Sequence, residues 1–163
     1  DVLKNAIKNN QIVYNFAALS DLDRAMHEPL ISARTNILGT VQALNLCRKY
    51  KVKRLVYASS ISVYGPQEYY GADPINEDDV PNPTNLYGMT KYVNDFSAAN
   101  YISKYGLDLR GIRICTVFGH GRKTGATGMI GGLLMSLPAV GKPIDLPFEA
   151  NLFDHFSSNF STG

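Results

Sequence analysis

Hydrophobic residues along the chain gather in three short segments. The segments at 11–18 and 54–59 have the length and apolar character of strands that are buried on both faces of a sheet. A third segment, 107–115, has the composition of a further strand. The hydrophobic pattern therefore predicts three strands, separated by longer stretches in which the apolar residues follow a different spacing.

Between these segments, apolar residues return at every third or fourth position. This is the spacing of a helix that packs one face against a core. Helical segments are predicted over 29–50, where the proline at its start can open a helix, and over 85–105. Tyr92, Phe96 and Ala99 form the predicted apolar stripe of the second helix.

The order strand, helix, strand, helix, strand predicts the fold class. Such an alternation is typical of α/β proteins, here a doubly wound parallel sheet with right-handed crossovers and helices on both faces. Residues 65–85 include four prolines and are predicted to form a long loop, and loops of that length are commonly functional. Ligands of such sheets bind beyond the carboxyl ends of the strands.

Composition narrows the class of protein. The 163 residues, 45% hydrophobic and 18% charged, suit one globular domain. A formal net charge of +2 is too small to predict nucleic-acid binding. No signal peptide and no apolar run of about 18 residues occurs, so no membrane partner is expected and the predicted location is the cytoplasm. Cys47 and Cys115 are predicted as small core residues, and the histidines lack metal-ligand spacing, so no metal is expected.

The pattern Tyr87-x-x-x-Lys91 carries the candidate chemistry. Residues four apart on a helix lie on one face, one turn from each other. A phenol with a pKa near 10 is a poor base at neutral pH, but a cation one turn away favours the phenolate and lowers that pKa. A hydroxyl of Ser59 or Ser60, upstream, can hydrogen-bond the same substrate oxygen. The set can move a proton on and off an alcohol or carbonyl, the partner step to hydride transfer.

The predicted sheet helps to decide whether the Tyr87-x-x-x-Lys91 pattern is functional or occurs by chance. By itself the pattern also fits an ordinary amphipathic helix with a surface tyrosine and a solvated lysine. Ser59, Ser60 and Thr116 fall at the carboxyl ends of predicted strands, and Tyr87 opens the helix after the long loop. Because these positions converge on one edge of the sheet, they favour a functional Tyr87–Lys91 pair.

With these residues in place, the chain resembles the extended short-chain dehydrogenase/reductase family, specifically its NAD-dependent sugar-nucleotide epimerase/dehydratase group. Five stretches follow the family's order: Asn15-Phe16-Ala17-Ala18-Leu19, Asn36-Ile37-Leu38-Gly39-Thr40, Val56-Tyr57-Ala58-Ser59-Ser60-Ile61-Ser62-Val63-Tyr64-Gly65, Asn85-Leu86-Tyr87-Gly88-Met89-Thr90-Lys91 and Arg113-Ile114-Cys115-Thr116-Val117-Phe118-Gly119. The resemblance implies a partial Rossmann-like fold, NAD as cofactor with NADP left open, and a nucleotide-sugar substrate. It also implies a homodimer through helices 29–50 and 85–105, although core packing explains their apolar stripes equally well.

The resemblance implies a role for individual residues. Ser60 matches the hydroxyl that holds the substrate oxygen, Tyr87 the acid/base, and Lys91 the residue that binds the nicotinamide ribose and lowers the pKa of the tyrosine. Asn36 matches a helix asparagine near the cofactor, and its alternative role is a buried polar residue that satisfies backbone groups. The predicted cofactor-binding set is Phe16, Ala17, Ala18, Asn36, Ser59, Tyr87 and Lys91, and the predicted substrate-binding set is Ser60, Thr116 and Arg122.

Departures from the family pattern narrow the expected reaction. Sugar-nucleotide dehydratases carry an Asp-Glu pair directly after the active-site hydroxyl, where this chain has Ile61 and Ser62, so dehydration is not expected. Asn15 replaces a frequent histidine, and Thr116 replaces an asparagine with which several epimerases contact the sugar nucleotide. Arg122 could meet a substrate diphosphate or be a solvated loop charge.

The glycine-rich fingerprint that holds the pyrophosphate is expected directly after the first strand, and it occurs neither there nor in residues 1–10. We therefore interpret residues 1–145 as a partial NAD(P)-binding domain that carries the catalytic centre, and 146–163 as an unassigned tail. The predicted protein is a fragment of an NAD(P)-dependent nucleotide-sugar epimerase or oxidoreductase. Two alternatives stay open: an alcohol dehydrogenase or ketone reductase of the same family, and a catalytically silent, truncated binding module.

Overall fold

A computed structural model describes residues 2–117 and 132–144. They belong to two compact units, the first formed by 1–69 and 78–116 and the second by 70–77 and 117–163. The elements of the first unit are α1 (Val2–Ile7), β1 (Ile12–Asn15), α2 (Leu22–His27), α3 (Pro29–Ser32), the π-helical η1 (Ala33–Leu38), α4 (Gly39–Lys49), β2 (Arg54–Ser60), the 3₁₀ helices η2 (Ile61–Val63) and η3 (Gln67–Tyr69), α5 (Leu86–Tyr105) and β3 (Leu109–Ile114). The described helix of the second unit is α7 (Leu134–Ala139).

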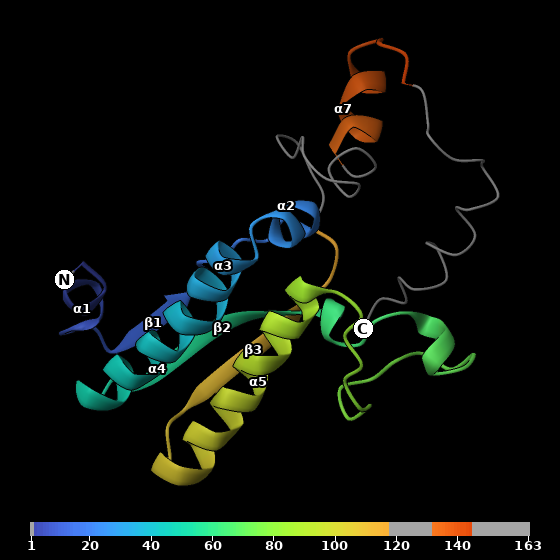
Figure 1. The fold of residues 1–163 in the computed structure, drawn as a ribbon. Helices are drawn as coiled ribbons and strands as arrows, with labels where there is room; N and C mark the ends of the chain where they lie inside the picture. The colour runs from blue at the N-terminus through green and yellow to red at the C-terminus, as the bar shows by residue number, and fades with distance from the viewer. Residues whose placement is uncertain (1, 118–131, 145–163) are drawn as a thin grey trace. The chain divides into compact units, whose positions relative to one another are not determined.

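Three parallel strands form the sheet of the first unit, in the order β1-β2-β3. Asn15 pairs with Tyr57 and Ser60 pairs with Ile114, so all three carboxyl ends lie toward one edge (Figure 1). The predicted alternation of strands and helices, and with it the α/β class, is confirmed. β1 is shorter than the predicted run 11–18, and four residues after its end the backbone of Leu19 hydrogen-bonds the side chain of Asn36 in η1.

Helices α4 and α5 cover one face of the sheet. α1 packs on α4, α4 packs on α5, and α5 packs on β2 and β3 (Figure 1). Both crossovers advance in the same direction across the sheet, and right-handed crossovers of that kind place their helices on the same face. Tyr14 and Ile112 lie on the other face, where they are 66% and 49% exposed. The second helical layer of a doubly wound sheet is therefore not formed by residues 2–117.

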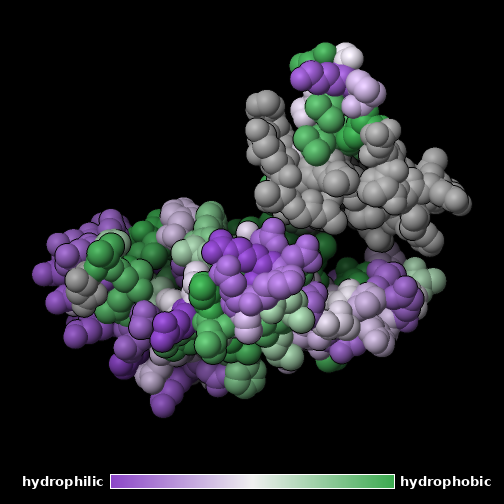
Figure 2. Space-filling view, turned by 45° about the horizontal axis from the view of Figure 1, so that its top comes forward, coloured by the Kyte–Doolittle hydropathy of each residue, from purple (hydrophilic) through white to green (hydrophobic). Residues whose placement is uncertain are grey.

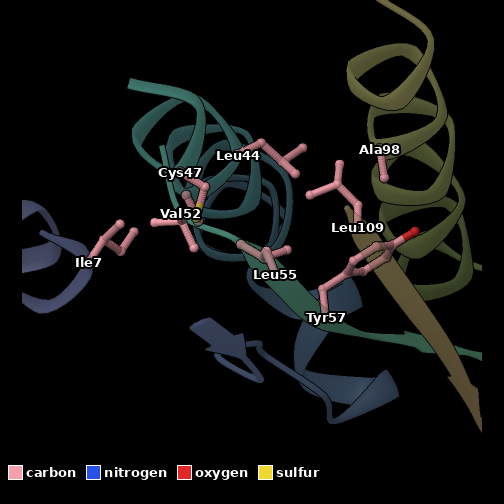
Figure 3. Packing of buried hydrophobic residues seen from close by; sticks show 9 residues of the cluster. Ile7, Leu44, Cys47, Val52, Leu55, Tyr57, Ala98 and Leu109 are labelled. Carbon is pink, nitrogen blue, oxygen red and sulfur yellow. The ribbon is translucent and has the colours of Figure 1, made fainter. Parts of the chain in front are cut away.

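The hydrophobic core lies between the sheet and the helices, as Figure 3 shows. Its members are Ile7, Ala43, Leu44, Cys47, Val52, Leu55, Tyr57, Ala98 and Leu109. Leu44 and Leu55 are 0% and 1% exposed, and fully burying such a side chain stabilises the fold by about 1.5–3 kcal/mol. The ring of Tyr57 lies against Gly111, where an added Cβ would come within 2.5 Å of the phenol oxygen. The glycine therefore makes room for the ring.

Helix α5 has the predicted extent but buries a different face. Tyr92 is half-buried, whereas Phe96 and Ala99 are exposed, so of the two explanations left open for this stripe, core packing does not hold. The buried face includes the polar residues Lys91 and Asn94, at 3% and 2% exposed. Because the buried face of α5 includes polar residues, the spacing of its apolar residues does not identify that face.

The two cysteines have different surroundings. Cys47 is buried as predicted, and burial raises the pKa of its thiol to about 11. Cys115 is exposed, so its prediction as a core residue is wrong. It directly follows Ile114, the last residue of β3, at a point where the chain has left the sheet.

The surface carries hydrophobic side chains among hydrophilic ones. In Figure 2, green hydrophobic and purple hydrophilic patches alternate over the face in view. The exposed apolar residues include Leu38 of η1 together with Met89 and Phe96 of α5, which are 50%, 44% and 64% exposed. Within residues 2–117 and 132–144, no helix is long and apolar enough to cross a membrane, and no cluster of side chains suits a metal ion.

Candidate active site

Tyr87 and Lys91 lie on the first two turns of α5. The side chain of Asn85 caps the helix, because its Oδ1 accepts the N–H of Gly88 at 2.8 Å. The cap fixes where the helix begins and therefore places Tyr87 at its start. The Nζ atom of Lys91 lies 5.4 Å from the centroid of the Tyr87 ring, so the cation faces the phenol ring as the spacing predicts.

The Lys91 side chain reaches from α5 to the sheet. The residue is 3% exposed, and its Nζ donates to the carbonyl of Ala58 in β2 at 2.8 Å. Burial lowers the pKa of Lys91, and the carboxylate of Asp95, one turn further along the helix, opposes that shift. Among the described residues the ammonium has this one acceptor, so two of its three N–H groups are left for a ligand.

Ser60 lies at the turn where β2 passes into η2. Its Oγ accepts the N–H of Ser62 at 3.1 Å and donates to the Ser62 hydroxyl, also at 3.1 Å. The first turn of α5 packs on this turn so closely that a Cβ added to Gly88 would lie 2.2 Å from the Ser62 carbonyl oxygen. Ser60 and Tyr87 therefore belong to two segments in direct contact. The structure brings the predicted catalytic set of Ser60, Tyr87 and Lys91 to one edge of the sheet.

Ser59 lies one residue earlier, on the side of the strand that faces the helices. It is 2% exposed, and its Oγ has no hydrogen-bond partner within the part of the chain that the structure describes. A buried hydroxyl without a partner is uncommon in folded proteins and calls for a ligand or an ordered water. Ser59 is thus compatible with its predicted place in a cofactor site.

Asn36 of η1 is completely buried, and its side chain bonds to protein groups. Its Oδ1 accepts the N–H of Leu19 at 2.7 Å, while its Nδ2 donates to the Leu19 carbonyl and to Thr90 Oγ1, both at 3.1 Å. Of the two roles predicted for Asn36, this geometry favours a buried polar residue that satisfies backbone groups over a direct cofactor contact.

The other predicted site residues lie where the chain leaves the sheet. Phe16 is 57% exposed, Ala17 is exposed and Ala18 is half-buried, all directly after β1. Thr116 is half-buried, two residues after the end of β3. Arg122 lies outside the described residues, and so do the predicted tail 146–163 and residue 145 before it.

These groups fit the nicotinamide and ribose half of a dinucleotide. The exposed apolar segment 16–18 offers a surface for a flat ring, and the spare N–H groups of Lys91 suit the ribose hydroxyls. A pyrophosphate needs a glycine-rich turn at a helix N-terminus, and the described residues 16–32, which follow β1, contain no glycine. The described residues therefore offer groups suited to proton transfer and to the nicotinamide ribose, and no glycine-rich turn directly after β1.

A charged pair that was not predicted from the sequence lies beside Lys91. Arg113 of β3 donates from Nε to Asp95 Oδ2 at 3.1 Å, and it also hydrogen-bonds Tyr64 and lies 4.8 Å from the centroid of that ring. Asp95 is one helical turn beyond Lys91, and this i, i+4 spacing was a signal that the sequence offered. The contact with Arg113 needs the fold, because the two residues come from different elements.

A parallel α/β sheet with a serine, a tyrosine and a buried lysine at its carboxyl edge defines the class of the extended short-chain dehydrogenases/reductases. The chain belongs to the NAD-dependent epimerase/dehydratase family, whose sequence profile matches residues 1–146.

Comparisons with individual proteins agree with this family. The chain is 32% identical over 113 residues to a putative UDP-glucose 4-epimerase of Methanocaldococcus jannaschii, a match that covers 69% of this chain and 36% of that protein. It is similar to MoeE5 in complex with UDP-glucose and NAD, with a TM-score of 0.57 and 33% identity, over 67% of this chain and 35% of that one. It is also similar to UDP-glucose 4-epimerase from Brucella ovis in complex with NAD, with a TM-score of 0.63 and 29% identity, over 69% and 34%. In each match the chain spans about a third of the relative's length.

Proposed function

We propose that the protein is an NAD-dependent epimerase of nucleotide sugars, in which Tyr87 exchanges a proton with a sugar hydroxyl. The observation that carries this proposal is the buried ammonium of Lys91 facing the Tyr87 ring at 5.4 Å, on a helix that packs against the turn of Ser60. A cation in that place favours the phenolate. The similar proteins support the substrate class, since they are named UDP-sugar epimerases or were solved with UDP-glucose and NAD.

Each residue of the centre has a defined role in this proposal. Tyr87 takes the proton from the sugar hydroxyl and later returns it. Lys91 stabilises the phenolate and holds the ribose hydroxyls with its spare N–H groups, and Ser60 hydrogen-bonds the substrate oxygen once its hydroxyl turns away from Ser62. Bound NAD would supply the hydride acceptor and donor for the sugar carbon. A cytoplasmic location accompanies this function and stays a prediction.

The residues after Ser60 favour epimerisation over dehydration. Elimination of water from a sugar needs an acid and a base beside the ketone. Ile61 is 42% exposed and has no ionisable group, and the hydroxyl of Ser62 is engaged with Ser60. The site therefore has groups that can exchange a proton with a sugar hydroxyl. At positions 61 and 62 it has no acid or base that could remove another hydroxyl as water.

An epimerisation assay with the complete protein tests the proposal. UDP-glucose and UDP-glucuronate are incubated with catalytic NAD, and the products are separated by chromatography. We expect one of them to form its 4-epimer without net accumulation of NADH. Net oxidation of NADH with a ketone, and no isomerised sugar, would instead support a reductase of the same family. No binding of NADH, followed by nicotinamide fluorescence, would support the catalytically silent module.

We further propose that two copies pair through the helices that flank the site. Leu38 of η1 and Phe96 of α5 expose half or more of their surface on elements that pack against each other, and burying such side chains stabilises a dimer. We expect Phe96→Ser to shift the protein from dimer to monomer in sedimentation experiments. Val80→Ser, which alters a loop residue that is 77% exposed, should leave the dimer unchanged. A wild-type protein that sediments as a monomer contradicts this arrangement.

A further inference from the structure

Buried polar side chains connect the helices of the first unit behind the site. They lie on the helical stretch that follows Pro29 and on α5, and each is at most 4% exposed: Ser32, Asn36, Thr40, Thr90, Lys91 and Asn94. Polar groups are costly to bury unless they are hydrogen-bonded. Their hydrogen bonds therefore indicate which parts of the structure they hold in place.

Asn36 is the centre of this network and lies in the π-helical turn η1. The N–H of Gly39 bonds to the carbonyl of Arg34, five residues earlier, which is the mark of a π turn. Such turns are rare and are frequent at functional sites. The Asn36 side chain bonds both the N–H and the carbonyl of Leu19, as a neighbouring strand would. It thereby fixes the segment 16–20, where the ladder of β1 has already ended.

Two residues of α5 hold Asn36 in turn. Thr90 Oγ1 accepts from Asn36 Nδ2 at 3.1 Å and donates to the carbonyl of Tyr87 at 2.7 Å. Asn94 Nδ2 donates to the main-chain carbonyl of Asn36 at 2.9 Å. The side chain and the main chain of Asn36 are thus tied to α5 at two points one turn apart. Hydrogen bonds therefore run without a break from Leu19 to the backbone of Tyr87.

We propose that Thr90 and Asn94 are positioning residues, which act through Asn36 to hold the segment 16–20 in a fixed place relative to Tyr87. This inference rests on the function proposed above, in which the segment lines the cofactor and Tyr87 meets the sugar hydroxyl. The hydride and the proton leave the same C–H and O–H unit of the sugar, so cofactor and base must be placed together. A displacement of about 1 Å can lower a rate by about 10²-fold.

Four variants separate positioning from simple packing. Thr90→Val keeps the shape of the side chain and removes the hydroxyl that bridges Asn36 to Tyr87, and Thr90→Ser restores that hydroxyl. Asn94→Ala removes the second tie. Asn100→Ala is the matched control, because Asn100 Nδ2 also donates to a helix carbonyl, that of Phe96 at 2.8 Å, but on the exposed side and within α5.

Amide hydrogen exchange at Leu19, in the complete protein without ligand, is the first measurement. The Leu19 N–H donates to Asn36, so its exchange reports whether the segment is held. Relative to the amide of Leu44 in the core, we expect exchange about tenfold faster in Thr90→Val and Asn94→Ala, and unchanged in Thr90→Ser and Asn100→Ala. Comparison with the Leu44 exchange rate corrects for a general loss of stability in a variant. Unchanged relative protection of Leu19 in both altered proteins would overturn the proposal.

Steady-state kinetics of epimerisation are the second measurement. We expect kcat to fall by about 10- to 100-fold in Thr90→Val and Asn94→Ala while KM for the sugar changes by less than about twofold, because geometry rather than binding is lost. Thr90→Ser should recover most of kcat. A fall of the same size in Asn100→Ala, or none in Thr90→Val, contradicts a positioning role. If the complete protein epimerises no nucleotide sugar, the proposed function fails, and the exchange at Leu19 still decides whether the link exists.

Discussion

Replacing Tyr87 with phenylalanine is expected to lower the turnover of the complete enzyme by about 10²–10⁴-fold and to leave its fold intact. Phenylalanine keeps the ring that faces Lys91 Nζ at 5.4 Å but lacks the hydroxyl that exchanges the proton. The loss should appear in kcat and hardly in KM, since the rest of the site still binds the substrate. Steady-state kinetics with the sugar that the enzyme epimerises measure both constants.

Tyr92→Phe is the matched control for this experiment. Tyr92 is a half-buried tyrosine on the same helix and lies outside the catalytic set. Its variant should turn over at nearly the wild-type rate. A Tyr87→Phe enzyme with near-normal kcat contradicts the assignment of the base. Equal losses in the two variants would point to α5 as a whole rather than to proton transfer.

The sequence predicted the elements of the fold because local signals mark them. The ends of α5 are set by Asn85, which caps the first turn, and by Gly106, whose φ of 66° is the left-handed conformation of a helix C-cap. The buried face of α5 was not predictable in the same way. Hydrophobic spacing favours Phe96, but the face that packs against η1 and the sheet includes the polar residues Lys91 and Asn94. Their burial depends on hydrogen-bond partners that lie far away in the sequence.

The candidate site likewise has a part that could be predicted from the sequence and a part that could not. The placement of Ser60, Tyr87 and Lys91 at one edge of the sheet was predictable, because strand ends and helix spacing determine it. The side chains that hold this edge together were not. Asn36 meets Leu19, 17 residues away, and Thr90, 54 residues away. Contacts over such separations follow from the three-dimensional fold and leave no periodic pattern in the chain.

Replacing Lys91 with methionine is expected to remove most of the activity with little change in the free energy of unfolding at neutral pH. Methionine keeps an unbranched chain in the buried space but has no ammonium to be desolvated. The variant removes the desolvation cost of a buried charge but leaves the Ala58 carbonyl without its donor. Because these two effects oppose each other, we expect stability within about 1 kcal/mol of the wild type. Turnover should fall by about 10²–10⁴-fold, because Tyr87 loses the cation that favours its phenolate. Urea denaturation and kinetics on the same preparation measure both quantities.

The pH dependence of stability gives this comparison a second readout. Burial lowers the pKa of Lys91 below its ordinary value of 10.5. Between the folded and the unfolded pKa, the unfolded chain binds more protons, so the stability of the wild type rises with pH in that window. The Lys91→Met variant has no titrating group at position 91, so its stability does not rise with pH for this reason. Any stability advantage of the variant should therefore shrink as the pH approaches about 10.

The two results together decide why the chain keeps a lysine at this buried position. A variant that is strongly destabilised at neutral pH, with a loss of activity that matches its unfolded fraction, would mean that Lys91 serves the fold through its bond to Ala58. A variant that is as stable as the wild type and inactive would mean that folding gains nothing from the ammonium. Burial alone favours an apolar residue here, so this second outcome would support the proposal that the charge serves the reaction at Tyr87.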